Sequence, residues 1–324
     1  MKQTQAPLDR FASSPLRPQS AAAICSRTYA KLEWLVPGII PLEGVSMVVA
    51  PPKAGKSIFL LNVAISNTAG TPILEHFPPQ RILNITYLDL ESSDRRVEGR
   101  ISHMTDNPPT NLTMVFKHPR LDTDGRTVLK DYLDHNPVDV LIVDILAAIQ
   151  TERKISNTHN YNLDQQEISW FTDLSKTYGI AVVLVHHTRK TKSESWVDMV
   201  LGTHGISGTV DTILYLHRQE GQRDATLHVT GRDVEEENYI MRFNTTTFRW
   251  KLIGRQSDDL SGLSQSKQEV VSLLDCYDEM MTPTDIARHL DKSTSYIKKL
   301  LANLVVDGYV LRGERGEYTG RIRT

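Results

Sequence analysis

A-P-P-K-A-G-K-S, residues Ala50–Ser57, follows directly on the apolar run Val45–Ala50 and opens a helical pattern. A strand, a tight loop ending in Gly-Lys-Ser and a helix together form a cradle for a nucleoside triphosphate. Backbone N–H groups of the loop and the positive end of the helix dipole favour phosphate there. The alternative is an accidental strand, loop and helix. We expect the nucleotide to contact Pro51, Pro52, Lys53, Ala54, Gly55, Lys56, Ser57 and Ile58.

Two side chains of this loop have separate expected roles. Lys56 adds a positive charge near the β- and γ-phosphates, and the Ser57 hydroxyl is a hard oxygen ligand for Mg²⁺. The usual pattern G-x-x-x-x-G-K-[ST] begins with glycine, whereas this chain has Ala50; the second glycine, Gly55, is present. ATP and Mg²⁺ are therefore the expected cofactors.

Composition limits the class of protein. The chain has 324 residues and a net charge of −2, so a nucleic-acid-binding surface must be local. Cys25 and Cys276 lie far apart without metal-ligand spacing, which fits a reducing cytoplasm. No apolar run approaches the ~18 residues of a membrane span, so no membrane partner is expected. Residues 1–24 are rich in Ser, Pro, Ala and Gln and are predicted to be flexible.

Strand and helix patterns alternate through a predicted ATPase domain over residues 25–254, which indicates an α/β fold: a parallel sheet with helices on both faces. The last four strands read as a meander that extends the sheet antiparallel. The predicted strands are Val45–Ala50, Asn84–Leu90, Thr113–Lys117, Val140–Asp144, Ala181–His187, Ile213–His217, Thr226–Thr230, Ile240–Phe243 and Phe248–Leu252. The predicted helices are Lys56–Ser66, Ser92–Met104, Arg126–His135 and Asp164–Tyr178.

A second, smaller domain is predicted at the C-terminal end. Residues 255–266 are polar and read as a linker. Residues 267–324 then contain three helical patterns, Lys267–Tyr277, a helix capped by Thr282 before Pro283, and Ser293–Val306. A hairpin of Tyr309–Arg312 with Glu317–Thr319 follows. Three helices and a β-wing predict a winged helix-turn-helix domain.

Two acids at strand ends are candidates for the chemistry of hydrolysis. Asp144 ends a buried strand at the edge where α/β proteins bind ligands, so it is the expected Walker B acid on the metal. The alternative is an acid that caps the next turn. Glu91 follows Asp89 with period two at another strand tip, and we expect it to act as general base on water. Its alternative is an N-cap-like acid for the helix from Ser92.

His187 and Arg232 are the remaining catalytic candidates. His187 ends a buried strand and is expected to contact the γ-phosphate and report its loss, although a strand-end histidine can be purely structural. Arg232 lies in Gly-Arg-Asp after an edge-type strand and can reach a neighbour's nucleotide as an arginine finger in trans. The alternative for Arg232 is an ion pair with Asp233 or with Glu235–Glu237.

In combination, these elements resemble the RecA-like ring ATPases, and most closely the plasmid RepA type of hexameric replicative helicase with its phage and mobile-element relatives. The resemblance covers about Leu32–Leu252. It implies phosphate and Mg²⁺ binding by Lys56 and Ser57, a base at Glu91, metal binding by Asp144, a sensor at His187 and a finger at Arg232. The matching stretches are E-W-L-V-P-G-I-I-P (Glu33–Pro41), A-P-P-K-A-G-K-S, Y-L-D-L-E-S-S-D-R-R, D-V-L-I-V-D, V-L-V-H-H-T-R-K, G-T-H-G-I-S-G-T-V-D (Gly202–Asp211) and G-R-D.

Two surfaces are expected to bind DNA. In RecA-like rings, the loops after the Walker B and sensor strands, here Ile145–Asn162 and Thr188–Gly205, line the channel. The second carries Arg189, Lys190 and Lys192, suited to a single-strand backbone unless it is an ordinary solvated charge run.

In the C-terminal domain, residues 265–291 have two basic and six acidic side chains, and residues 292–324 have seven basic and three acidic ones. The net charges of these segments are therefore −4 and +4, and the positive segment contains the expected recognition helix and wing. Docking to protein, or packing on the ring, is the alternative use of the domain. The expected DNA contacts are Ser295, Tyr296, Lys298, Lys299, Arg312 and Arg315.

The sequence thus predicts a cytoplasmic Mg²⁺-dependent ATP hydrolase, a hexameric helicase or translocase acting in replication or recombination of a plasmid, phage or mobile element. An ATP-gated DNA-binding regulator or loader without motor activity is the second hypothesis. A recombination ATPase that forms filaments is the third.

Overall fold

The computed structural model describes residues 19–152, 157–188, 210–255, 260, 263–277, 279–307, 309–313 and 315–320, with only the backbone for 157–161. Its contacts divide the chain into two units, Met1–Leu32 and Glu33–Thr324. In the first unit, helix α1 (Ala21–Cys25) begins after Ser20, whose hydroxyl accepts a hydrogen bond from Ala23 N at 3.1 Å.

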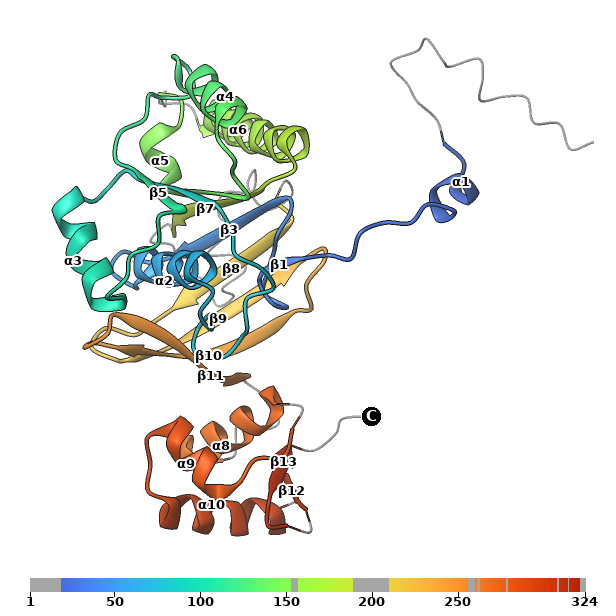
Figure 1. Ribbon diagram of the computed structural model, residues 1–324, viewed down its shortest axis with the longest axis vertical. Helices are drawn as coiled ribbons and strands as arrows, with labels where there is room; N and C mark the ends of the chain where they lie inside the picture. Colours follow the sequence, from blue (N-terminus) through green and yellow to red (C-terminus); the bar gives the residue numbers. More distant parts are fainter. Residues whose placement is uncertain are drawn as a thin grey trace, which may run out of the picture. The chain divides into compact units, whose positions relative to one another are not determined.

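A nine-stranded sheet organises the second unit, in the order β11-β10-β9-β8-β3-β7-β6-β4-β5 (Figure 1). Strands β5, β4, β6, β7, β3 and β8 run parallel, and β8 to β11 form an antiparallel meander. The expected α/β fold with a large mixed sheet is therefore confirmed. The strands are β3 (Val45–Ala50), β4 (Ile85–Asp89), β5 (Leu112–Val115), β6 (Val140–Asp144), β7 (Ala181–His187), β8 (Thr212–His217), β9 (Asp224–Gly231), β10 (Glu237–Asn244) and β11 (Arg249–Arg255).

Helices cover both faces of the parallel strands. Alternate residues of β6 show this: Val140 and Ile142 join the core under α2 (Lys56–Ala69) and α3 (Asp94–Met104). Leu141 and Val143 instead join the core under α4 (Gly125–His135), α5 (Leu146–Ile149) and α6 (Asn157–Tyr178). Burial on both faces explains why these strands read as continuous apolar runs.

Two expectations about connecting segments need correction, and one pair of strands was not predicted. The segment Ile145–Asn162, expected to be a loop, contains α5 and the first residues of α6, which begins at Asn157. The predicted linker 255–266 is shorter at both ends, because Arg255 ends β11 and Gln265 starts α8. A short pair, β1 (Trp34–Val36) and β2 (Ile40–Pro41), was not predicted, since strands of two or three residues carry no readable alternation.

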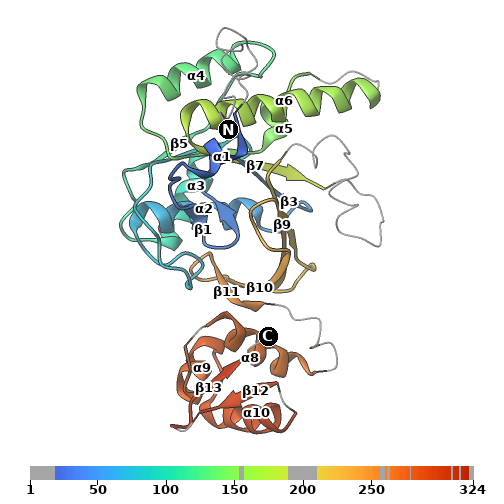
Figure 2. The ribbon, with the colours of Figure 1, turned by 90° about the vertical axis from the view of Figure 1, so that its right-hand side faces the viewer.

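The C-terminal residues form three helices and a two-stranded sheet (Figure 2). The expected cap is present at Thr282, whose hydroxyl accepts a hydrogen bond from Asp285 N at 3.2 Å. Ser293, expected as the first helical residue, is instead the cap of the next helix and accepts a hydrogen bond from Tyr296 N at 3.3 Å. The elements are α8 (Gln265–Cys276), α9 (Pro283–Leu290), α10 (Thr294–Val306), β12 (Val310–Arg312) and β13 (Tyr318–Gly320).

These helices pack directly on the last strand of the large sheet. Ile253 of β11 is buried in the same core as Val270, Ile286 and Leu301. A Cβ atom at Gly254 would lie 2.3 Å from the backbone of Ser272, so only glycine permits the approach of β11 to α8. This packing gives a physical reason for β11 to continue beyond the predicted strand end. Among the described residues, no helix combines the length and apolar character that membrane crossing requires.

Candidate nucleotide site

The loop between β3 and α2 has a backbone that its sequence makes possible. Gly55 precedes α2 with φ of 105°, and Lys53 has φ of 63°. A Cβ atom at Gly55 would lie 2.9 Å from Cζ2 of Trp250, which is fully buried. Glycine is therefore required at this position both by the backbone conformation and by the indole ring.

Lys56 lies at the centre of the site with only 5% of its surface exposed. Its ammonium group donates hydrogen bonds to the carbonyl oxygens of Ala50 at 3.1 Å and Pro51 at 3.2 Å. Burial lowers the pKa of Lys56, while the charges of Asp144 and Glu91 oppose that effect. A triphosphate entering this loop would meet a desolvated lysine, whose ammonium group would exchange these carbonyl oxygens for phosphate oxygens.

His187 links Lys56 to Glu91. Parallel pairing of β3 with β7 puts His187 beside Ala50, at the edge of the sheet where the loop begins. The Lys56 Nζ atom lies 3.0 Å from His187 Nδ1, and His187 Nε2 lies 3.4 Å from Glu91 Oε1. Because an ammonium group can only donate, Nδ1 accepts and the ring proton is on Nε2, where it can be donated to Glu91.

Asp144 ends β6 next to Asp89 of β4 and is 1% exposed. The Tyr87 hydroxyl donates a hydrogen bond to Asp144 Oδ2 at 2.7 Å, whereas Oδ1 has no hydrogen-bond partner in the described part of the chain. Burial raises the pKa of Asp144, and its contacts with the Ser57 and Tyr87 hydroxyls oppose that rise. An unpaired carboxylate oxygen beside a serine hydroxyl has the chemistry of a divalent-cation site.

The rest of a cation's ligands would have to come from elsewhere. Across the described residues, no three or more His, Cys, Asp or Glu side chains gather into a metal-binding group. Magnesium usually keeps several waters and takes one or two protein oxygens together with substrate phosphates. The donors present at Asp144 and Ser57 fit that use.

Asp89 and Glu91 differ in their surroundings. Asp89 is buried, and its Oδ1 accepts a hydrogen bond from Ser92 N at 2.8 Å. The following helix begins at Asp94, and the Ser93 side chain accepts from Arg96 N as its cap. Glu91 is thus not the cap of this helix, and its carboxylate lies beside His187 instead.

Tyr87 and Arg218 belong to the site although neither was predicted. Tyr87 lies two residues before Asp89 on β4, so the same period-two alternation could have identified it. The Arg218 Nη2 atom donates to the carbonyl oxygen of Lys53 at 3.1 Å, and its guanidinium carbon lies 5.7 Å from the centre of the Trp250 ring. Its position directly after β8, at the same sheet edge as the loop, is the signal that was available.

Arg232 is not brought to this loop. It follows β9, whose last residue Gly231 pairs with Thr212, and Thr212 pairs with Ser46 near the start of β3. Five residues at about 3.3 Å each separate Ser46 from Pro51, roughly 17 Å, which exceeds the reach of an arginine side chain. The Arg232 Nη1 atom donates to Asp211 Oδ1 at 3.0 Å, a partner different from the acids considered in the sequence.

The expected DNA-binding residues divide into two groups. Arg189, Lys190 and Lys192 lie outside the described residues. The other group is solvent-exposed on α10, on β12 and in the turn after it, and consists of Ser295, Tyr296, Lys298, Lys299, Arg312 and Arg315.

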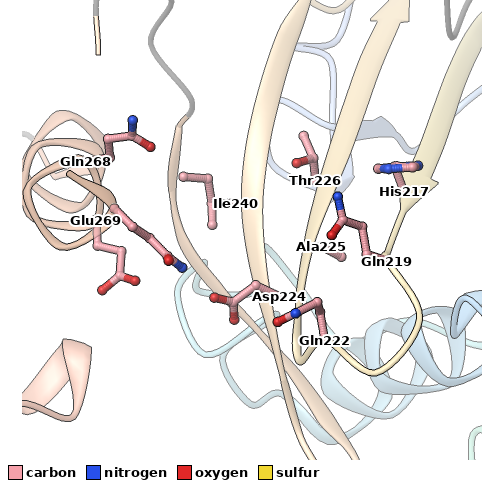
Figure 3. Close-up of a pocket in the computed structure, with 10 residues that line it drawn as sticks. His217, Gln219, Gln222, Asp224, Ala225, Thr226, Ile240, Gln268 and Glu269 are labelled. Carbon is pink, nitrogen blue, oxygen red and sulfur yellow. The ribbon is translucent and has the colours of Figure 1, made fainter. Parts of the chain in front are cut away.

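A separate pocket of about 440 Å³ lies between the β8–β9 turn and α8 (Figure 3). Arg242 donates to both Asp224 oxygens, at 2.7 and 2.9 Å, and to Glu269 of α8 at 3.3 Å. Lys292, just before α10, also binds Glu269. These ion pairs connect the C-terminal helices to β9 and β10, the strands that follow Arg218 in the chain.

Comparison with known proteins adds a family and a fold. A family model described as "AAA domain" matches residues 12–193, more than half of the 324-residue chain. Among solved structures, one described as an ATPase domain superimposes with a TM-score of 0.50 at 12% identity, covering 65% of this chain and 84% of that chain. At this identity, the likeness concerns the fold alone. A comparison with curated proteins gave no match.

Proposed function

The chain belongs to the AAA domain family, and from that premise we propose that it is an ATP hydrolase that requires Mg²⁺ and acts on DNA. The observation that carries the proposal is the continuous contact from buried Lys56 through His187 to Glu91, beside the unpaired oxygen of Asp144. A structural ion pair would explain one of these contacts, but not a desolvated lysine together with a buried carboxylate, Asp144, that keeps one oxygen without a hydrogen-bond partner in the described structure.

Each side chain has a role in this proposal. The loop amides and Lys56 bind the phosphates, while Ser57 and Asp144 would hold Mg²⁺, which neutralises phosphate charge. Glu91 accepts a proton from the attacking water, and its contact with His187 Nε2 orients the carboxylate. When Lys56 moves to the γ-phosphate, His187 loses its partner at Nδ1 and can report nucleotide state to the segment after β7.

Arg232 supports a site shared between copies. Because Arg232 lies at the opposite edge of the sheet from the loop of its own chain, an arginine finger at this position would have to act on the nucleotide of another subunit. We therefore propose a head-to-tail assembly, a hexameric ring as in RecA-like ATPases, in which each arginine completes a neighbouring site.

The C-terminal helices and sheet have the order of a winged helix-turn-helix, and we propose that they bind duplex DNA. Lys298 and Lys299 are exposed on α10, and neither has an ion-pair partner in the described ranges of the chain. Single-stranded DNA would pass through the ring channel. On this basis we place the protein among helicases or translocases of plasmids, phages or mobile elements.

ATP hydrolysis by Lys56→Ala tests the nucleotide site. Turnover should fall to background, while Lys130→Ala, which removes an exposed lysine of α4, should keep wild-type turnover. Near wild-type turnover of Lys56→Ala would refute the proposed site.

A strand-displacement assay separates a motor from an ATP-gated regulator. ATP-dependent unwinding of a forked duplex supports the helicase, whereas duplex binding without unwinding supports the regulator. Negative-stain images then distinguish closed rings from filaments.

A further inference from the structure

Asp211 and Arg232 form a built unit at the edge of the sheet opposite the nucleotide loop. Asp211 Oδ2 accepts a hydrogen bond from Val45 N at 2.9 Å, and Oδ1 accepts one from Arg232 Nη1 at 3.0 Å. The backbones are also joined, because Asp211 N donates to Val45 O and Arg232 N donates to Asp211 O, both at 2.9 Å. The carboxylate is thus fixed to the first residue of β3 while it contacts the guanidinium.

Two glycines allow this close approach. A Cβ atom at Gly44 would lie 2.5 Å from Asp211 Oδ2, and one at Gly231 would lie 2.5 Å from the Asp211 carbonyl oxygen. The glycine of Gly-Arg-Asp therefore has a steric role: it brings the backbone of Arg232 against Asp211. In the described part of the chain, Gly44, Val45, Asp211 and Gly231 all contribute to the position of this arginine.

The arrangement restrains the arginine without burying it. The Arg232 side chain remains 64% exposed, whereas that of Asp211 is 21% exposed. A guanidinium group has five N–H donors, so one that is bonded to a carboxylate can still donate to a phosphate. Holding a long side chain in one orientation in advance removes conformational entropy that would otherwise be lost in the transition state.

We propose that Asp211 is a positioning residue that orients Arg232 toward the nucleotide of a second copy of the chain. This inference rests on the proposed role of Arg232 in trans. The two oxygens of the Asp211 carboxylate then have separate roles. Oδ2 holds the start of β3 through Val45 N, and the negative charge on Oδ1 orients Arg232.

Asp211→Asn separates the two tasks, because the amide oxygen can still accept from Val45 N while the amide nitrogen cannot accept from Arg232. A matched control exists at the start of β6. Asp139 Oδ2 accepts from Asn84 N at 2.7 Å, and its Oδ1 accepts from Arg81 at 2.9 Å. Asp139→Asn breaks the same kind of ion pair at a site away from Arg232. The Asp139 side chain is 22% exposed, similar to that of Asp211.

Steady-state ATPase kinetics of the full-length oligomer, with thermal unfolding alongside, test the inference. We expect Arg232→Ala to lose about 10³-fold or more in kcat. Asp211→Asn should lose about 10- to 100-fold in kcat with unchanged KM, and Asp139→Asn should keep wild-type kcat. The double variant Asp211→Asn with Arg232→Ala should equal Arg232→Ala alone, since Asp211 acts through the arginine.

The outcomes are distinguishable. If Arg232→Ala retains kcat, the trans finger of the proposed function is wrong. If Arg232→Ala is inactive while Asp211→Asn matches wild type, or the double variant is slower than Arg232→Ala, the finger stands and the positioning role of Asp211 is refuted. An equal loss of kcat in Asp139→Asn would also refute it, because the effect would then be structural.

Discussion

Replacing Asp144 by Asn should stabilise the nucleotide-free protein while it abolishes hydrolysis. The wild-type carboxylate is buried, with the Tyr87 hydroxyl on Oδ2 and the Ser57 hydroxyl nearby, while Oδ1 has no hydrogen-bond partner in the described structure. An unsatisfied buried polar group costs roughly 1–3 kcal/mol, and more when it is charged. Asn keeps an oxygen for the Tyr87 hydroxyl and removes the charge. We expect the free energy of unfolding to rise by about 1–3 kcal/mol near pH 8.

The gain in unfolding free energy should increase with pH. Burial raises the pKa of Asp144 above its ordinary value of 3.8. Below that value the carboxyl group is protonated in both folded and unfolded chains, so burial of charge does not reduce the free energy of unfolding. As pH rises from there through the raised pKa, the unfolded chain ionises first and the wild type loses stability, whereas the variant does not. The difference in unfolding free energy between Asp144→Asn and the wild type should therefore increase as the pH rises.

Urea unfolding in EDTA between about pH 4.5 and 8 measures this difference. Asp89→Asn is the matched control, because that buried carboxylate has a partner at Ser92 N and should give no gain. Magnesium with a non-hydrolysable ATP analogue should stabilise the wild type far more than Asp144→Asn. The reasoning would be contradicted if Asp144→Asn were less stable than the wild type at about pH 8. A gain in unfolding free energy that stays constant across the pH range would also contradict it.

Three further substitutions test other parts of the site. Gly55→Ala should cost about 1–3 kcal/mol of unfolding free energy and weaken nucleotide binding, because its Cβ meets Trp250 on a backbone with φ of 105°; an unchanged urea midpoint would refute this. Arg218→Ala should raise the KM for ATP about tenfold with little change in kcat, since it removes a charged hydrogen bond to the Lys53 carbonyl; wild-type kinetics would show that the contact is dispensable. His187→Ala should lower kcat about 10²-fold yet leave nucleotide affinity within about twofold, measured by turnover and by fluorescence titration; loss of affinity instead would assign His187 to binding.

The parts of the fold that local pattern determines were predictable. Strands β3, β6 and β7 match the predicted ranges to the residue, because each is a predominantly apolar run ended by a polar residue or by the loop. The cap at Thr282 was likewise predictable, since a capping hydroxyl acts within three residues of itself. Parallel pairing of such strands places Lys56, Asp144 and His187 at one edge of the sheet.

Contacts between distant segments were not predictable in the same way. Trp250 packs against Gly55 only because the meander folds back over α2, and the sequence between them carries no sign of that register. The contacts of Asp211 with Val45 and Arg232 were not predictable, because they depend on which strands lie beside β8. Such contacts require the strand order, which local periodicity does not specify.

The central claim is that the loop Ala50–Ser57 binds the phosphates of ATP. A structure determined with Mg²⁺ and a non-hydrolysable ATP analogue tests it most directly. The account predicts the triphosphate against the amides of the loop, with Lys56 on the terminal phosphates and a cation bound between Ser57, Asp144 and the phosphate oxygens. A nucleotide bound elsewhere on the chain, with Lys56 still on the Ala50 carbonyl and His187, would contradict it.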